Sequence, residues 1–120
     1  MRKILLGLIF SIVSTFAFEH LNVENFDDKI KDKNVIIDFY ATWCPPCKIL
    51  AKSLSAYDKV KSSNVEIYKV DIDKNMDLAI KYNVKALPTL GYFKNGELIV
   101  TEVGIKDVPQ LSNSVRKHFK

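Results

Sequence analysis

Residues 35–48 are VIIDFYATWCPPCK, and this stretch indicates both the fold and the chemistry of the chain. Its first six residues, 35–40, are mostly β-branched or aromatic, which predicts a strand buried on both faces of a sheet. Apolar residues then recur at helical spacing over about 46–60, and a proline is tolerated in the first turn of such a helix. Cys44 and Cys47 are therefore expected where a strand ends and a helix begins.

The position of Cys44 and Cys47 favours thiol chemistry. Two intervening residues close a small ring, so the pair can form an intramolecular disulfide that is readily made and broken. Unpaired N–H groups and the positive end of the helix dipole favour a thiolate at a helix N-terminus. We expect Cys44, just before the helix, to be an exposed nucleophile, and Cys47 to be a more buried thiol that resolves a mixed disulfide.

Two other interpretations of the cysteine pair have less support. A zinc site would need two further ligands, and His20 and His118 lie near opposite ends of the chain without a matching spacing. A purely structural disulfide would be expected to join distant segments, because its stabilising effect grows with the loop that it closes. We therefore expect no metal, and no cofactor other than the Cys44–Cys47 disulfide itself.

The rest of the chain alternates between helical and strand patterns. Helices are expected over about 23–31, 46–60, 73–82 and 107–119, and strands over 35–40, 65–71, 89–94 and 97–103. A short strand over 19–21 has only a weak signal, and Asn95-Gly96 suits the turn of a two-residue hairpin. This order predicts an α/β protein with a central mixed β-sheet flanked by helices on both faces.

The first 17 residues differ from the remainder of this single-domain-sized chain. A short basic start is followed by an uncharged apolar run over 4–18, with the small residues Thr15 and Ala17 at its end. This is the pattern of a secretory signal peptide, so we expect cleavage after Ala17 and a domain over 18–120. The run is short for a membrane-spanning helix, and an uncleaved signal anchor is the alternative.

The charge of the chain indicates no nucleic-acid partner. Removal of Arg2 and Lys3 with the signal lowers the formal net charge of +4 by two. The remaining lysines are interleaved with acidic residues, as in residues 71–74, which predicts a mixed, solvated surface. Export would also place the two cysteines in an oxidising compartment, where thiols tend to form disulfides.

Several separated motifs resemble the thioredoxin family. In addition to the segment around the cysteines, the match includes residues 70–73, 85–89, 93–97 and 103–104, in order and at the family's spacing. The resemblance extends essentially over residues 20–119. It implies the thioredoxin-like fold and a thiol–disulfide oxidoreductase that uses Cys44 as nucleophile and Cys47 as resolving thiol.

The resemblance also implies roles for two charged residues. Asp38 matches the family's buried acid behind the resolving cysteine, and burial raises the pKa of a carboxyl, which suits a group that takes a proton from Cys47. Lys69 matches the lysine that lies near this acid. The alternatives are an Asp38 on an exposed sheet edge and an ordinary surface lysine at position 69.

Five residues match positions that contact substrate in the family. Trp43 would offer partners a flat surface, with a role in the core as the alternative. Pro88 matches a cis-proline that leaves the backbone of Leu87 free to pair with a substrate strand, and Gly104 matches a glycine that lets substrate approach closely. Pro45 stands where thioredoxins proper have glycine, so their redox potential does not carry over.

The resulting expectation is an exported, periplasmic protein-disulfide reductase of a Gram-negative-like bacterium. Its expected partners are protein thiols and disulfides, a membrane thiol reductase that donates electrons, and apocytochrome c as one client; the chain is expected to be a monomer. The alternatives are an oxidase that donates its disulfide, and a non-catalytic binding module that uses the surface around Trp43 and Pro88. Strongly oxidising members of the family that the chain resembles often have a histidine between the cysteines, and its absence here favours a reductase or isomerase over an oxidase.

Overall fold

The computed structural model describes residues 18–120, and the predicted signal segment 1–17 lies outside the described residues. The elements in chain order are α1 (Phe26–Ile30), β1 (Asn34–Tyr40), α2 (Pro45–Asp58), β2 (Val65–Asp71), α3 (Met76–Lys81), β3 (Thr89–Lys94), β4 (Glu97–Val103) and α4 (Val108–His118). The strands β2, β3 and β4 have the bounds that the sequence predicts.

One difference from the predicted elements lies at the start of α1. The sequence predicts a helix from position 23, with Asn22 as its cap, but the helix begins at Phe26. The side chains of Asn22 and Asn25 each accept the other's backbone N–H, at 2.9 and 2.8 Å. Side chains of this type compete with helical hydrogen bonds and stabilise turns, which explains the shorter helix.

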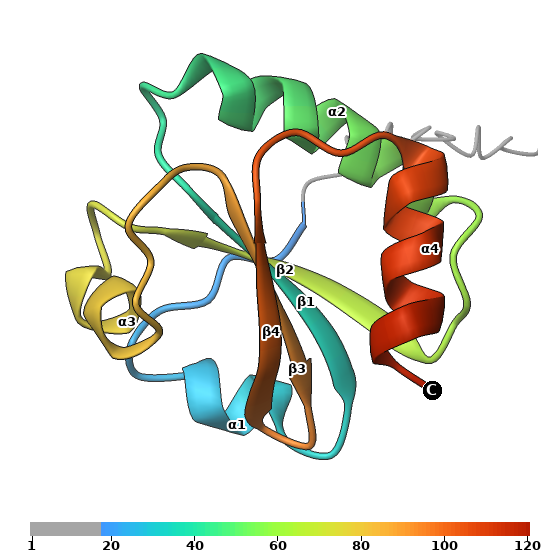
Figure 1. Cartoon of the computed structure of the whole chain (residues 1–120). Coiled ribbons are helices and arrows are strands. Elements are labelled where there is room, and N and C mark those ends of the chain that lie inside the picture. Colours follow the sequence, from blue (N-terminus) through green and yellow to red (C-terminus); the bar gives the residue numbers. More distant parts are fainter. Residues whose placement is uncertain (1–17) are drawn as a thin grey trace, which may run out of the picture.

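The four strands form one mixed sheet in the order β2-β1-β3-β4 (Figure 1). β1 pairs in parallel with β2 and antiparallel with β3, and β3 and β4 form the predicted hairpin. The weakly predicted strand over 19–21 is a single parallel bridge between His20 and Lys69, on the outer edge of β2. This topology leaves β1, which leads to the cysteines, in the middle of the sheet.

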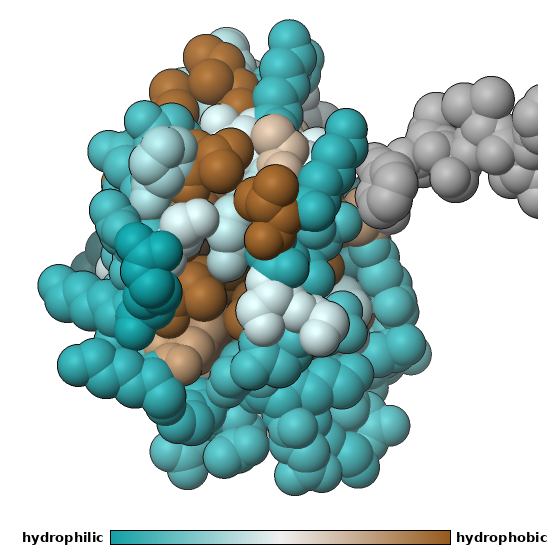
Figure 2. All heavy atoms as spheres, turned by 90° about the vertical axis from the view of Figure 1, so that its right-hand side faces the viewer, coloured by the Kyte–Doolittle hydropathy of each residue, from teal (hydrophilic) through white to brown (hydrophobic). Residues whose placement is uncertain are grey.

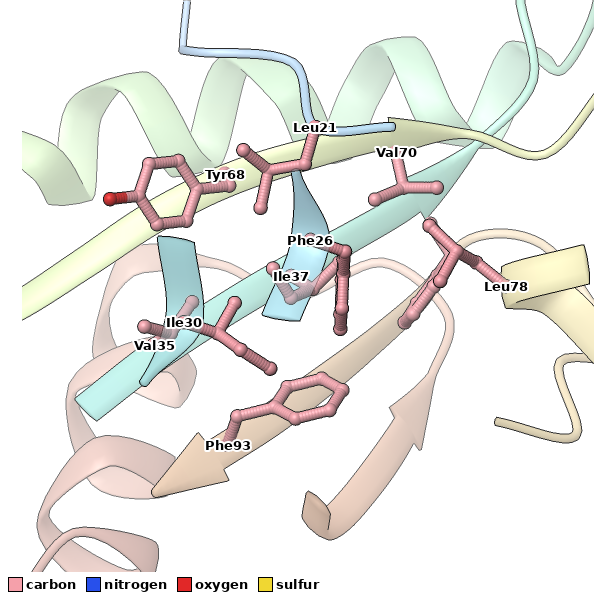
Figure 3. Packing of buried hydrophobic residues seen from close by; sticks show 10 residues of the cluster. Leu21, Phe26, Ile30, Val35, Ile37, Tyr68, Val70, Leu78 and Phe93 are labelled. Carbon is pink, nitrogen blue, oxygen red and sulfur yellow. The ribbon is translucent and has the colours of Figure 1, made fainter. Parts of the chain in front are cut away.

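Helices cover both faces of the sheet, as predicted. On the face of α1 and α3, Phe26 and Ile30 point toward Phe93, with Leu78 of α3 beside them (Figure 3). Complete burial of such a side chain stabilises the fold by about 1.5–3 kcal/mol.

On the opposite face, α2 and α4 pack over a second cluster of buried residues: Ile36, Leu50, Leu54, Tyr57, Val65, Ile67, Leu90, Tyr92 and Leu111. The outer surface around α4 is hydrophilic in its lower part, and hydrophobic residues show mainly in its upper and central parts (Figure 2). Within residues 18–120, every helix is too short or too polar to cross a membrane.

Candidate active site

The junction between β1 and α2 places the two cysteines at a helix N-terminus, as the sequence predicts. Cys44 is the N-cap of α2, with an extended backbone, and Pro45 and Pro46 form the first turn. Prolines fit there because the first N–H groups of a helix have no intrahelical partner.

Cys44 and Cys47 form a disulfide, with their Cα atoms 5.3 Å apart. The backbone N–H of Cys47 also donates a hydrogen bond to Sγ of Cys44 at 3.2 Å. The N–H of Cys47 would be a donor to a Cys44 thiolate as well, and a hydrogen bond to an anion is stronger than one to a neutral group. The local geometry therefore favours a thiolate at Cys44.

The expected exposure of Cys44 is wrong for this disulfide form. Cys44 is 4% exposed and Cys47 is 3% exposed, so the two residues are equally buried. Both belong to one small apolar cluster with Ala41, against which Leu87 packs. What distinguishes the cysteines is the opening that each of them lines.

Cys44 lines a groove of about 400 Å³ whose other walls include Trp43, Pro45, Ile72 and Leu87. Trp43 is 66% exposed, so the interpretation of Trp43 as a core residue is wrong. Its Nε1–H donates a hydrogen bond to the carboxylate of Asp73 at 2.8 Å, which restrains the indole at the groove. An apolar groove beside a reactive sulfur suits the binding of a peptide segment.

The loop that faces the disulfide contains the expected proline. The Leu87–Pro88 peptide bond is cis, as the resemblance implies. The carbonyl of Pro88 accepts a hydrogen bond from the N–H of Gly104 at 2.9 Å, so these two segments lie together. Gly104 has φ +103°, a left-handed conformation that favours glycine, and a Cβ there would contact no other atom within 4 Å.

Asp38 lies in the middle of β1 and is fully buried, so the alternative of an exposed edge position is wrong. Neither of its carboxyl oxygens has a hydrogen-bond partner. Burial raises the pKa of this carboxyl from 3.8 to about 7, although Lys69 acts in the opposite direction. A carboxyl with such a pKa exchanges a proton readily near neutral pH.

Lys69 occupies the position of β2 that pairs with Asp38. Its Nζ lies 4.3 Å from the centre of the Tyr40 ring. Lys69, Tyr40 and Cys47 line a second opening of about 220 Å³, which does not include Cys44. The resolving cysteine and the lysine thus share an opening of their own, and position 69 is not that of an ordinary surface lysine.

Sequence reasoning assigned no function to three residues in or next to the groove. Asp73 holds Trp43, and Ile72 and Lys85 line the groove beside Cys44. All three lie in motifs that resemble the thioredoxin family, but their role depends on contacts across the chain that no local pattern specifies. In the described part of the chain, His, Cys, Asp and Glu side chains form no group of three or more that could hold a metal ion.

A family model described as Thioredoxin matches residues 17–117. The chain belongs to the thioredoxin family. The expected fold is confirmed by the solved structure of chloroplastic thioredoxin z, which is similar with a TM-score of 0.76 and 28% identity, over 87% of this chain and 96% of that one.

Individual thioredoxins are also similar in sequence. Thioredoxin of Bacillus subtilis is 38% identical over 96 residues, which cover 80% of this chain and 92% of that protein. Thioredoxin of Chlamydia trachomatis is 43% identical over 95 residues, which cover 79% and 92%. The mitochondrial thioredoxin of Rattus norvegicus is 42% identical over 107 residues, which cover 88% of this chain and 64% of that protein.

The chain therefore has a thioredoxin-type disulfide oxidoreductase centre at Cys44 and Cys47. The thioredoxin homologues and this disulfide pair support protein-disulfide reductase activity, with protein thiols and disulfides as reaction partners.

Proposed function

We propose that this thioredoxin is an exported reductase that keeps cysteines of periplasmic proteins reduced. The main support for disulfide chemistry is the Cys44–Cys47 disulfide at the start of α2, which lies beside an apolar groove and the cis bond before Pro88. Support for export comes from the sequence of residues 1–17 alone, whose basic start, apolar run and small residues are typical of a signal peptide.

In the first step, the thiolate of Cys44 attacks one sulfur of a client disulfide. A bond forms between Cys44 and that sulfur, the client's own disulfide breaks, and the second client sulfur leaves as a thiolate. The N–H of Cys47, which lies 3.2 Å from Sγ of Cys44, stabilises the attacking anion.

In the second step, Cys47 attacks Sγ of Cys44. The proton of the Cys47 thiol goes to the carboxylate of Asp38, the bond between Cys44 and the client breaks, and the client leaves with two reduced sulfurs. The enzyme is left as the disulfide form of the structure, so two electrons pass from the cysteine pair to the client. The pKa of Asp38 near 7 matches this role, because such a base accepts a proton at neutral pH and releases it again.

The client segment would lie in the groove beside Cys44. Trp43 and Pro45 would contact it on one side, the free backbone of Leu87 would pair with it, and Gly104 would leave room for its approach. Trp43, Pro45 and Leu87 line the groove. Gly104 does not, but its N–H donates a hydrogen bond to the carbonyl of the neighbouring Pro88.

Each turnover needs a new pair of electrons. No cofactor beyond the disulfide is needed for the exchange itself, but an exported reductase must receive electrons from outside its compartment. We propose a membrane thiol reductase as the donor. One client class that this chemistry suits is apocytochrome c, whose C-x-x-C-H thiols must be reduced before haem attachment.

The test is a pair of cysteine variants in a Gram-negative host. Cys44→Ser should abolish insulin reduction, and Cys47→Ser should accumulate mixed disulfides with periplasmic clients, since the bond formed in the first step is then not resolved. Unchanged insulin reduction and an unchanged cellular phenotype in Cys44→Ser would contradict catalysis by this cysteine pair. Trapped clients that are all cytoplasmic would contradict export.

The redox potential separates a reductase from an oxidase. A value near or below about −270 mV, measured against glutathione, supports a reductase, whereas a value near about −120 mV would show a protein that donates its disulfide.

A further inference from the structure

Asp38 and Lys69 occupy positions where an ion pair would be expected, but their side chains do not form one. They occupy paired positions on the neighbouring parallel strands β1 and β2. Side chains alternate along a strand, so both point to the face of Ile36 and Ile67, which lie under α2. Opposite charges at paired positions on one face lie close enough to attract each other. Nevertheless, the carboxyl oxygens of Asp38 have no hydrogen-bond partner.

The Lys69 side chain contacts Tyr40 instead. Tyr40 lies two residues beyond Asp38 on β1 and on the same face, and Nζ of Lys69 is 4.3 Å from the centre of its ring. The negative face of an aromatic ring attracts a cation within about 6 Å. The ring is thus a competing partner for the ammonium, in an opening that also exposes Lys69 to water.

Residues 19–21, which precede α1, form hydrogen bonds with both Tyr40 and Lys69. The Tyr40 hydroxyl and Nδ1 of His20 are joined by a hydrogen bond of 3.1 Å, and their rings meet edge to face. The same segment pairs with the backbone of Lys69, whose carbonyl accepts from the N–H of Leu21 at 2.8 Å and whose N–H donates to Glu19 at 3.0 Å. The position of the ring relative to the lysine is therefore fixed by hydrogen bonds on both sides.

We propose that Tyr40 is a positioning residue: its ring draws the Lys69 ammonium away from Asp38 and leaves the buried carboxyl without an ion-pair partner. The functional consequence rests on the proposed transfer of a proton from Cys47 to Asp38. An ammonium in direct contact would hold Asp38 as a stable carboxylate and make it a weak base. With the ammonium on the ring, the carboxyl can accept and release a proton near neutral pH.

The other groups around Asp38 and Tyr40 are consistent with this arrangement. From β3, the apolar Leu90 pairs with Asp38, and from α2, Cys47 lines the shared opening. Burial, followed by the charges of Asp71 and Asp38, raises the pKa of Tyr40, so its hydroxyl stays protonated.

Burial and Lys69 lower the pKa of His20, with a further lowering by Lys74 and an opposing effect of Asp71. His20 is therefore neutral at neutral pH, and its Nδ1 can accept the proton of the Tyr40 hydroxyl.

The test is a titration of Asp38 in the oxidised protein, followed by the carbon-13 chemical shift of its carboxyl group. Tyr40→Leu removes the ring and should let Lys69 pair with Asp38, which lowers the midpoint by about 1–3 pH units. Tyr40→Phe keeps the ring and loses only its hydrogen bond to His20, so its midpoint should fall by less than that of Tyr40→Leu. A midpoint in Tyr40→Leu that stays unchanged or rises would overturn the proposal.

Two lysine variants identify the source of the shift. Adding Lys69→Met to Tyr40→Leu should return the midpoint to the wild-type value or above it, because no ammonium is left to pair with Asp38. Lys33→Met is the matched control: Nζ of Lys33 also lies over a tyrosine ring, 5.8 Å from the centre of Tyr68, and Lys33 is not among the charges that act on Asp38. Its midpoint should equal that of the wild type.

A variant of the exposed His20 tests the contact between Lys69 and Tyr40 without removing the Tyr40 ring. His20→Ala leaves the ring in place but removes its hydrogen bond, so the midpoint should fall by less than in Tyr40→Leu. A rise would contradict the proposal. The pH profile of mixed-disulfide resolution by Cys47 should move in the same direction as the titration. A titration that shifts while this profile does not would disprove the proton transfer and leave the positioning by Tyr40 intact.

Discussion

The carboxyl groups of Asp38 and Glu102 differ in their hydrogen-bond partners. Asp38 lies in the middle of β1, and neither of its carboxyl oxygens has a hydrogen-bond partner. Glu102, on β4, accepts hydrogen bonds from Tyr92 at 3.0 Å and from Ser114 at 2.9 Å, and contacts His118 at 3.0 Å. The first carboxyl is held without partners, and the second joins the sheet to α4.

Their pKa values diverge accordingly. Burial raises the pKa of Asp38 to about 7. Burial acts in the same direction on Glu102, but the hydrogen bonds from His118, Ser114 and Tyr92 outweigh it and lower the pKa of this carboxyl. Asp38 is both more deeply buried than Glu102 and without hydrogen-bond partners, and together these two differences separate a carboxyl that is available for chemistry from one that stabilises the fold.

The largest expected effect is the pH dependence of stability caused by Asp38. Its pKa in the folded protein, about 7, lies above the ordinary 3.8, so its contribution is fully present below pH 3.8 and is lost as the pH rises through 7. The loss amounts to about 4 kcal/mol of unfolding free energy. Urea titrations of the oxidised wild type and Asp38→Asn from pH 4 to pH 8 measure it. A difference between the two proteins that does not change with pH would contradict the unpaired, buried carboxyl.

The same variant should affect one step of the reaction. In Asp38→Asn, resolution of a mixed disulfide by Cys47 at pH 7 should slow by about 100-fold, the lower end of what a general base contributes. The first attack by Cys44 should keep its rate. Stopped-flow kinetics with a chromogenic disulfide separates the two steps, and Glu102→Gln serves as the control in which both rates are expected to be unchanged.

Removal of the partnered carboxyl should act on stability alone. Glu102→Leu leaves the buried hydroxyl of Tyr92 without its acceptor, which costs about 1–3 kcal/mol of unfolding free energy. The pKa of Glu102 is lowered from 4.5, so its contribution is present above pH 4.5 and is lost as the pH falls below that value. The pH dependence is opposite in sign to that of Asp38. Urea titrations at pH 7 and pH 3 measure it, and a loss of equal size at both values would contradict it.

The smallest expected effect concerns a single partner of Glu102. Ser114→Ala removes one hydrogen bond to this carboxylate while Tyr92 and His118 keep theirs, so the unfolding free energy should fall by about 1 kcal/mol. Thermal unfolding followed by circular dichroism measures the change. Ser112→Ala, on the same helix but outside the contacts of Glu102, is the matched control and should have a smaller effect.

The sequence predicts the elements and the location of the disulfide because both depend on local patterns. The β-branched run of β1 and the Asn95-Gly96 turn each determine their own structure. The position of Asp38 in an apolar strand likewise indicates its burial. The contacts of Lys69 were not predictable, since they depend on which of two partners on β1 attracts its ammonium.

The exposure of Cys44 was predicted wrongly for a related reason. The helix cap indicates where the sulfur lies, but the cover over Cys44 comes from segments far along the chain, such as the loop at Leu87. Accessibility at this site is therefore a property of the tertiary structure. The mutual capping of Asn22 and Asn25, which shortens α1, also required atomic contacts to be recognised.

The register shift in the β3–β4 hairpin affects how this protein behaves at high concentration. β2 is shielded at its outer edge by the bridge through His20, whereas β4 forms the other edge of the sheet in the part of the chain that the structure describes. The pairing skips Ile99, between Tyr92 opposite Val100 and Phe93 opposite Leu98. Such a bulge interrupts the regular row of backbone donors and acceptors, so this edge is a poor template for addition of a strand from another molecule and resists aggregation.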